Sequence, residues 1–166
     1  MPAGFPARRH VRHWRTALMA ALIAFALFHA AAALAAETKS VENLEQTFAR
    51  EKDARKRARL ALEILDLRLD AVRVFVATGT MIEANNAVLP AYDAALSRLE
   101  QAVNTAAHVG TSKRVEVGLR RHMKDLEQVR MNVSSTERPL VEAVAARVEK
   151  VREAVLYSIM APKPKK

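Results

Sequence analysis

Apolar residues recur at helical spacing through most of the chain beyond residue 40, and the widest such pattern covers 54–78. It consists of two adjacent stripes, made of Leu60, Leu62, Ile64, Leu65, Leu67, Leu69, Val72, Val74, Phe75 and Val76. On a helix these stripes cover more than half of the circumference and leave one polar strip of Glu63, Asp66, Asp70 and Arg73. A helix that is apolar on more than one side must contact several neighbours, so we expect this helix to organise the fold.

Capping residues predict where the first helices begin and end. Ser40 is suited to cap a short helix over 41–50, and Asp53 to cap the long helix from Ala54 to Thr78. Gly79 follows directly, and glycine readily adopts the left-handed conformation in which many helices end.

A second long pattern extends from about Thr80 to His108 and contains a proline. Its apolar residues are spaced by three and four, as in a packed seam, and are Leu89, Tyr92, Leu96, Leu99 and Val103. Pro90 removes one backbone hydrogen bond and clashes with the preceding turn, at about 3 kcal/mol or more unless the helix bends. We therefore expect a kink or break between Asn85 and Leu89, and the next turn at 109–112.

Two further patterns complete the helical part of the chain. The first runs from Lys113 to about Met131, and its apolar face consists of Val115, Leu119, His122, Leu126 and Val129. The second is expected to begin with Ser135 or Thr136 as its cap and Pro139 in its first turn, where proline is tolerated. Its apolar row consists of Val141, Val144, Val148, Val151, Val155 and Ile159.

The connections between these patterns are short, which restricts the topology. Helices joined by turns of roughly two to six residues must run antiparallel to their sequence neighbours. The sequence therefore predicts an all-α fold, an antiparallel up-and-down helical bundle of about four long helices with the second helix kinked near Pro90. Stacked helical hairpins of the tetratricopeptide kind are less favoured, because the helices are long and no second copy of a repeat is found.

Residues 1–36 differ from the rest of the chain. Arginines without any acid occupy 8–15, a charge-free apolar stretch follows, and a run of small residues ends at Ala36. This order is typical of an export signal peptide, with cleavage expected after Ala35 or Ala36. The alternative is an uncleaved anchor, because about 20 apolar residues span a bilayer. We expect a periplasmic or secreted protein, or alternatively one anchored in the inner membrane and facing outward.

Most of the net positive charge of the chain comes from its two ends. Four of its 27 basic residues and none of its 18 acidic residues lie within 1–36, so the net charge falls from +9 to +5 without that segment. Lys163, Lys165 and Lys166 lie in a proline-spaced tail at 161–166, which we expect to be flexible and to attract an anionic surface weakly. No dense basic block interleaved with aromatic residues occurs, so nucleic acid is not an expected partner. We assign 37–160 to the bundle, which has no cysteine and hence no disulfide.

The acidic side chains of the polar strip are the first candidates for chemistry. Glu63, Asp66 and Asp70 lie on one strip of the 54–78 helix and could jointly hold a hard cation. Arg59 and Arg73 lie one turn away on the same strip, so the favoured interpretation is a ladder of charges that keeps this face in water.

His122 is the second candidate, because it occupies a position where leucine would be ordinary. It is a weak candidate for a metal ligand or a pH-sensitive group. The favoured interpretation is a partly exposed histidine that takes part in packing. The methionines Met81, Met123, Met131 and Met160 are expected to fill the core rather than to bind copper or haem.

Other chemistry finds no support in the sequence. Only His108 and His122 lie beyond residue 36, and no Glu-x-x-His pair, Cys-x-x-Cys-His motif, Gly-rich phosphate loop or nucleophile elbow occurs. We therefore expect no catalytic residue, no cofactor and no resident metal, and the protein is not expected to be an enzyme.

Two runs carry a resemblance to other proteins. KRARLALEILDLRLDAVRVFVATG from Lys56, the spacing at Ala91 to Ala94, and RPLVEAVAARVEKVREAVLYSIM from Arg138 are similar to small exported bacterial all-helical proteins of unassigned function. The resemblance implies a helical fold and export, and it supplies no active-site residues. We expect a non-enzymatic binding or interaction module of the cell envelope with an unknown protein or envelope partner, as a monomer or dimer. The alternative is a small-ligand or metal/haem carrier that uses the bundle interior.

Overall fold

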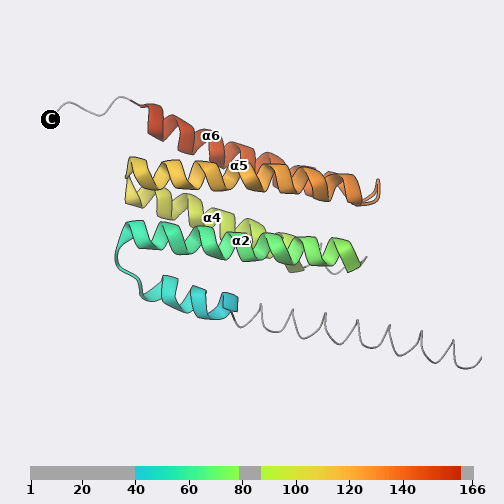
Figure 1. Cartoon of the computed structure of the whole chain (residues 1–166), viewed down its shortest axis with the longest axis horizontal. Coiled ribbons are helices and arrows are strands. Elements are labelled where there is room, and N and C mark those ends of the chain that lie inside the picture. Colours follow the sequence, from blue (N-terminus) through green and yellow to red (C-terminus); the bar gives the residue numbers. More distant parts are fainter. Residues whose placement is uncertain (1–39, 79–86, 162–166) are drawn as a thin grey trace, which may run out of the picture. The chain divides into compact units, whose positions relative to one another are not determined.

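The computed structural model describes residues 40–78 and 87–161. The chain divides into two compact units, Met1–Ser40 and Val41–Lys166, and the second holds nearly all of the described residues. These residues are helical apart from short connections and contain no strand, so the predicted all-α class is confirmed. Figure 1 shows the helical segment 40–50, followed by α2 (Ala54–Thr78), α4 (Leu89–Ala106), α5 (Val109–Asn132) and α6 (Arg138–Met160).

The helices pack mainly as two pairs. The most extensive contacts join α5 to α6 and α2 to α4, and α2 also lies along α5 (Figure 1). Short connections make α5 antiparallel to both α4 and α6. Helices α2 and α5 run parallel, because Leu62 lies against Gly118 and, one turn further along both helices, Asp66 contacts His122.

The long helix α2 has the predicted bounds. Asp53 caps it, since its Oδ1 accepts hydrogen bonds from the backbone N–H groups of Arg55 at 2.8 Å and Lys56 at 2.9 Å. The bond from the Lys56 backbone is the main reason why the pKa of Asp53 is lowered. Ser40, expected as a cap, lies within the preceding helical segment, and Gly79 lies outside the described residues.

Helix α4 ends close to its predicted position, whereas its predicted start near Thr80 lies outside the described residues. It begins at Leu89, directly after a π-helical turn at 87–88, with Pro90 in its first turn, where proline is tolerated. Residues 79–86, on which part of the expected kink falls, lie outside the described residues. The helix ends at Ala107, which has a left-handed backbone (φ 43°) and donates its N–H to the Val103 carbonyl at 3.1 Å.

The turn expected at 109–112 is wrong, because these residues form the first turn of α5. Two residues, Ala107 and His108, make the connection instead. The His108 side chain caps α5 by accepting a hydrogen bond from the backbone N–H of Thr111. A histidine cap is rare, and this explains why the expected start at Lys113 is four residues late.

The connection between α5 and α6 also uses a different residue from the one expected. The residue before α6 is Glu137, not Ser135 or Thr136, and it makes no side-chain cap bond. Its carboxylate instead accepts hydrogen bonds from the backbone N–H and the hydroxyl of Ser134, at 3.1 and 2.6 Å. Pro139 occupies the first turn of α6, as predicted.

The apolar core extends through α2, α4, α5 and α6. Its members from α2 are Ala58, Ala61, Ile64, Leu65, Leu69 and Val72, whereas Val74 is 40% exposed. Helices α2 and α5 lie close together at Gly118, where an added Cβ would lie 2.9 Å from Leu62 Cδ1. The row of valines predicted on α6 supplies Val141, Val148, Val151 and Val155.

Truncating the centre of α2 should destabilise the protein strongly. Leu65 is fully buried, so Leu65→Ala removes apolar contacts and leaves a cavity, and the free energy of unfolding should fall by about 2 to 5 kcal/mol. Urea unfolding followed by circular dichroism measures the change. Val117→Ala, at a site that is 63% exposed, is the control and should change it by about 0.5 kcal/mol or less. Equal effects at the two sites would contradict this core.

Candidate functional site

A buried polar chain lies where α2, α4 and α5 meet. His122 of α5 is fully buried, and its two ring nitrogens contact side chains from two other helices. Its Nδ1 lies 2.8 Å from the Tyr92 hydroxyl of α4, and its Nε2 lies 2.7 Å from Asp66 Oδ1 of α2. The expectation of a partly exposed packing histidine is therefore wrong, because this ring is completely enclosed and bonded on both sides.

The direction of these hydrogen bonds follows from the partners. The Asp66 carboxylate only accepts, so His122 Nε2 carries a proton and donates it. Burial, with the charges of Asp66 and Asp125, raises the pKa of Tyr92, so its hydroxyl stays protonated. In the neutral ring the Tyr92 hydroxyl then donates to Nδ1. Each polar group of this three-residue chain thus has a partner inside the protein.

Asp66 connects the buried ring to the surface. Its Oδ1 also accepts a hydrogen bond from Arg121 Nη2 at 2.6 Å, and its side chain is 35% exposed. Burial alone would raise the pKa of Asp66, but the hydrogen bonds from His122 and Arg121 outweigh burial and hold it below its ordinary value. The four residues form a continuous path from Tyr92 in the core to Arg121 in solvent.

A surface groove opens beside this path. One cavity of about 370 Å³ is lined by Asp66, Leu69, Asp70, Arg73, Arg121 and Asp125. A second cavity of about 520 Å³ continues along α2 and α5 and shares Arg73 and Asp125 with the first. Arg73 holds this region together, because it donates to Asp70 at 2.9 Å and to Asp125 at 2.6 Å.

The predicted acidic candidates do not converge. Glu63 is exposed, Asp66 is directed to His122 and Arg121, and Asp70 pairs with Arg73. Over 40–78 and 87–161, no group of three or more acidic or histidine side chains is arranged to hold a metal ion.

The methionines also differ from their expected role. Met123 packs against the core, as expected. Met131 and Met160 are 65% and 79% exposed, so they do not fill it. Met81 lies outside the described residues.

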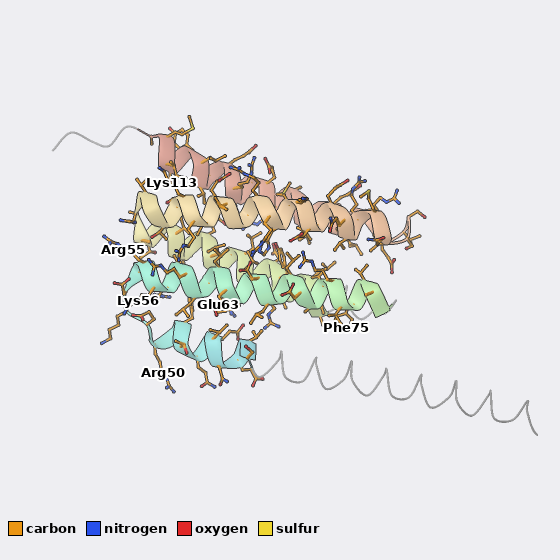
Figure 2. All side chains as sticks on the ribbon, viewed as in Figure 1. Arg50, Arg55, Lys56, Glu63, Phe75 and Lys113 are labelled. Atoms are coloured by element: carbon orange, nitrogen blue, oxygen red, sulfur yellow. The ribbon has the colours of Figure 1, made fainter. Side chains whose placement is uncertain are left out.

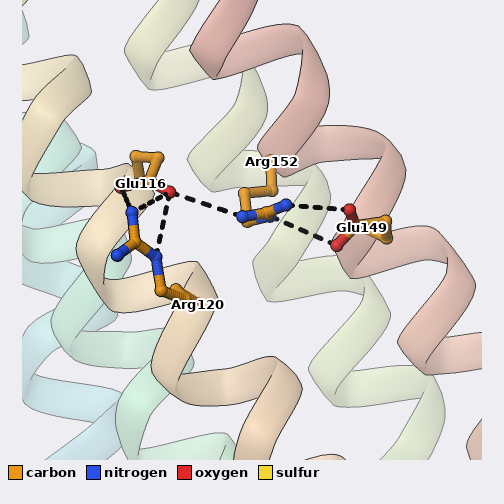
Figure 3. A network of polar contacts seen from close by, with 4 residues as sticks. All are labelled: Glu116, Arg120, Glu149 and Arg152. Atoms are coloured by element: carbon orange, nitrogen blue, oxygen red, sulfur yellow. Dashed lines mark hydrogen bonds and ion pairs between the residues drawn. The ribbon is translucent and has the colours of Figure 1, made fainter.

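A second polar cluster joins α5 to α6 (Figure 3). Glu116 is 5% exposed, and both of its carboxylate oxygens lie 2.8 Å from Arg120 Nη2. Arg152 of α6 reaches Glu116 Oε1 at 3.5 Å and Glu149 Oε1 at 2.9 Å. The cluster carries balanced charge, and its evident role is to fix one helix against the other.

Replacing His122 should destabilise the protein, because Tyr92 and Asp66 both lose a hydrogen-bond partner. His122→Leu leaves the buried Tyr92 hydroxyl without a partner and takes one hydrogen bond from Asp66, so it should destabilise the protein by about 1 to 3 kcal/mol. Adding Tyr92→Phe removes the unpaired hydroxyl and should recover part of this loss. A double-mutant cycle of urea unfolding measures the coupling. Additive effects, or a neutral His122→Leu, would contradict the buried chain.

Acid should lower the free energy of unfolding because Asp66 becomes protonated. Its pKa in the folded protein lies below the ordinary value of 3.8, so its contribution to stability is present above about pH 4 and disappears as the pH falls through the lowered pKa. Asp66→Asn should therefore be less stable at neutral pH and lose less stability between about pH 4 and pH 3 than the wild type. Urea midpoints across this range test it. Glu63→Gln, at an exposed site, is the control, and identical pH profiles for Asp66→Asn and wild type would contradict the assignment.

Comparison with other proteins adds no identification. The chain has no match among protein-family models, curated proteins or solved structures. None of the helices in the described part of the chain is both long enough and apolar enough to cross a bilayer. The function has to be argued from the side chains themselves.

Proposed function

We propose that this chain is an exported, non-enzymatic helical module that binds a protein or another component of the cell envelope through its outer surface. The observation that carries the proposal is that the buried polar groups already have hydrogen-bond partners within the protein. Both nitrogens of His122 are bonded to side chains of the protein, and the remaining core is almost entirely apolar. A ligand coordinated by this histidine would have to break one of those bonds.

Export is the second part of the proposal and rests on the order of residues in 1–36. In this proposal the mature protein begins at Ala36 or Glu37, folds over 37–160 as an up-and-down bundle that bends near Pro90, and works in the periplasm or outside the cell. Its tail at 161–166 adds a weak attraction to anionic surfaces. A protein that keeps 1–36 as an anchor would present the same helices outside the inner membrane.

The outer surface supports a binding role because the helices that form it are cross-linked by ion pairs. Glu45 accepts from Arg68 of α2 at 3.3 Å and from Arg98 of α4 at 2.9 Å, and Arg147 of α6 donates to Glu100 of α4 at 3.0 Å. Such a surface keeps its shape while apolar side chains remain in solvent, and Val117 is 63% exposed. Preorganised surfaces bind with a smaller loss of conformational entropy.

A small-ligand or metal/haem carrier is the second candidate, and the groove between α2 and α5 favours it. Its larger cavity, about 520 Å³, is within the usual range for small-molecule sites and has both apolar and polar lining residues. Val76 and Val129 supply the apolar part, and Gln128 and Asn132 supply amide groups. This site is a surface groove and differs from the bundle interior that the sequence suggested.

Isolation of the protein from its native envelope distinguishes these functions. Intact mass should show a chain that begins at Ala36 or Glu37, chemical cross-linking should capture a defined envelope partner, and metal and small-molecule analysis of the purified protein should find no stoichiometric ligand. Deletion of 162–166 should weaken envelope association only at low salt, because exposed charges are screened. A stoichiometric metal, haem or small molecule would overturn the interaction-module proposal in favour of the carrier.

A further inference from the structure

The basic residues of the described chain fall into two groups. Eight arginines pair with carboxylates and are Arg68, Arg73, Arg98, Arg120, Arg121, Arg130, Arg147 and Arg152. The other basic side chains in 40–78 and 87–161 have no ion pair, and eight of them lie on the short segment 50–59 or in the first turns of α5. One of the eight, Arg57, is half-buried and lies over the Phe48 ring, and the other seven are exposed. These seven, named here the basic end, are Arg50, Lys52, Arg55, Lys56, Arg59, Lys113 and Arg114.

The fold brings the members of the basic end together. Segment 50–59 contains the turn into α2, and α5 begins beside the start of α2 because the two helices run parallel. Figure 2 shows the labelled side chains of Arg50, Arg55, Lys56 and Lys113 at the same end of these helices. Two carboxylates of this segment oppose part of their charge, namely Asp53, which caps α2, and Glu51, which accepts a hydrogen bond from the Asp53 backbone, and the excess remains positive.

Two exposed side chains that are wholly or partly apolar, Tyr157 and Met160, lie at this end as well. Helix α6 runs antiparallel to α5, and the contact between Arg152 and Glu116 sets their register, so the last turn of α6 lies near the first turn of α5. In that last turn Tyr157 is 77% exposed and Met160 is 79% exposed. A tyrosine has an apolar ring and a polar hydroxyl, a combination enriched where protein meets the membrane interface.

We propose that the basic end, with Tyr157 and Met160, is a docking surface for an anionic lipid bilayer. The unpaired basic side chains are long, come from two separate stretches of the chain and have no ion-pair partner, so they suit a fluid layer of phosphate headgroups, where charge matters more than fixed geometry. Tyr157 and Met160 add contacts that insert below the headgroups.

This inference rests on the proposed export, because an envelope protein works beside membrane surfaces. A nucleic acid is a poorer fit, since strand-binding surfaces alternate basic residues with several stacking aromatics, and Tyr157 is the single exposed aromatic described at this end. An acidic protein is the other partner that charge alone would allow. Its capture in place of lipid is an outcome of the test below.

The test compares two variants that lose the same charge. The first is Arg55→Gln, Lys113→Gln, Arg114→Gln at the basic end. The matched control is Lys124→Gln, Arg138→Gln, Lys150→Gln, at exposed, unpaired positions further along α5 and α6. Protein from a secreting host is sedimented with vesicles of equal parts phosphatidylglycerol and phosphatidylcholine, and with pure phosphatidylcholine, after circular dichroism has confirmed folding.

The wild type should bind the anionic vesicles and not the neutral ones. Binding of the basic-end variant should be weaker by about tenfold or more, whereas the control should change by about threefold or less, since each basic residue near an anionic leaflet contributes about fivefold. Tyr157→Ser with Met160→Ser should weaken binding at high salt as well as at low salt, because apolar insertion is not screened.

Several results would overturn the inference. These are equal losses in the two charge variants, equal binding of wild type to both vesicle types, or no binding to either. Retention on immobilised polyglutamate through the basic end, without vesicle binding, would assign the surface to an acidic protein instead. None of these outcomes decides the proposed function, which is tested separately by the capture of an envelope partner through cross-linking.

Discussion

The width of the apolar surface on α2 is the constraint that determines how the other helices pack. A helix that buries Ile64 and Leu65 on adjacent faces cannot be covered by one neighbour, and in the structure α4 covers one side while α5 covers another. Helix α6 then packs mainly on α5. The parallel approach of α2 and α5 is close because Gly118 has no side chain at the point where Leu62 lies.

The same convergence of three helices explains the enclosed polar chain. A polar side chain at the junction of α2, α4 and α5 is cut off from water, and it is stable there only if all its hydrogen-bonding atoms find partners. Each helix supplies one such side chain, so the bonds between Tyr92, His122 and Asp66 specify how the three helices are placed against one another. An apolar junction would hold the helices together with less restriction on their rotation and sliding.

Sequence periodicity was sufficient to predict α2 and the apolar rows of α5 and α6, because a helix that buries one face repeats apolar residues every three or four positions. It was insufficient at the connection between α4 and α5. Gly110 suggested a turn, yet the left-handed residue is Ala107 and the cap is His108, neither of which is favoured by local preference. The packing of two long helices overrides such preferences.

The polar chain could not be predicted from one element at a time. Asp66 lies at the edge of a polar strip, Tyr92 in a seam and His122 in an apolar row, and each has an ordinary explanation within its own helix. The signal that links them is the presence of one hydrogen-bonding side chain in each of three apolar patterns. Pairing them requires the register between α2 and α5, which the lengths of the connections do not specify.

The separation of paired from unpaired basic residues gives the described helices a permanent dipole moment. Backbone dipoles contribute little to it, because α2 and α5 point one way while α4 and α6 point the other, so their macrodipoles largely cancel. The moment therefore comes from side chains and has its positive pole where segment 50–59 and the start of α5 lie. In the docking that we propose, the electric field of the negative surface decays over about 8 Å at physiological ionic strength, and it rotates such a molecule before contact so that the positive pole arrives first.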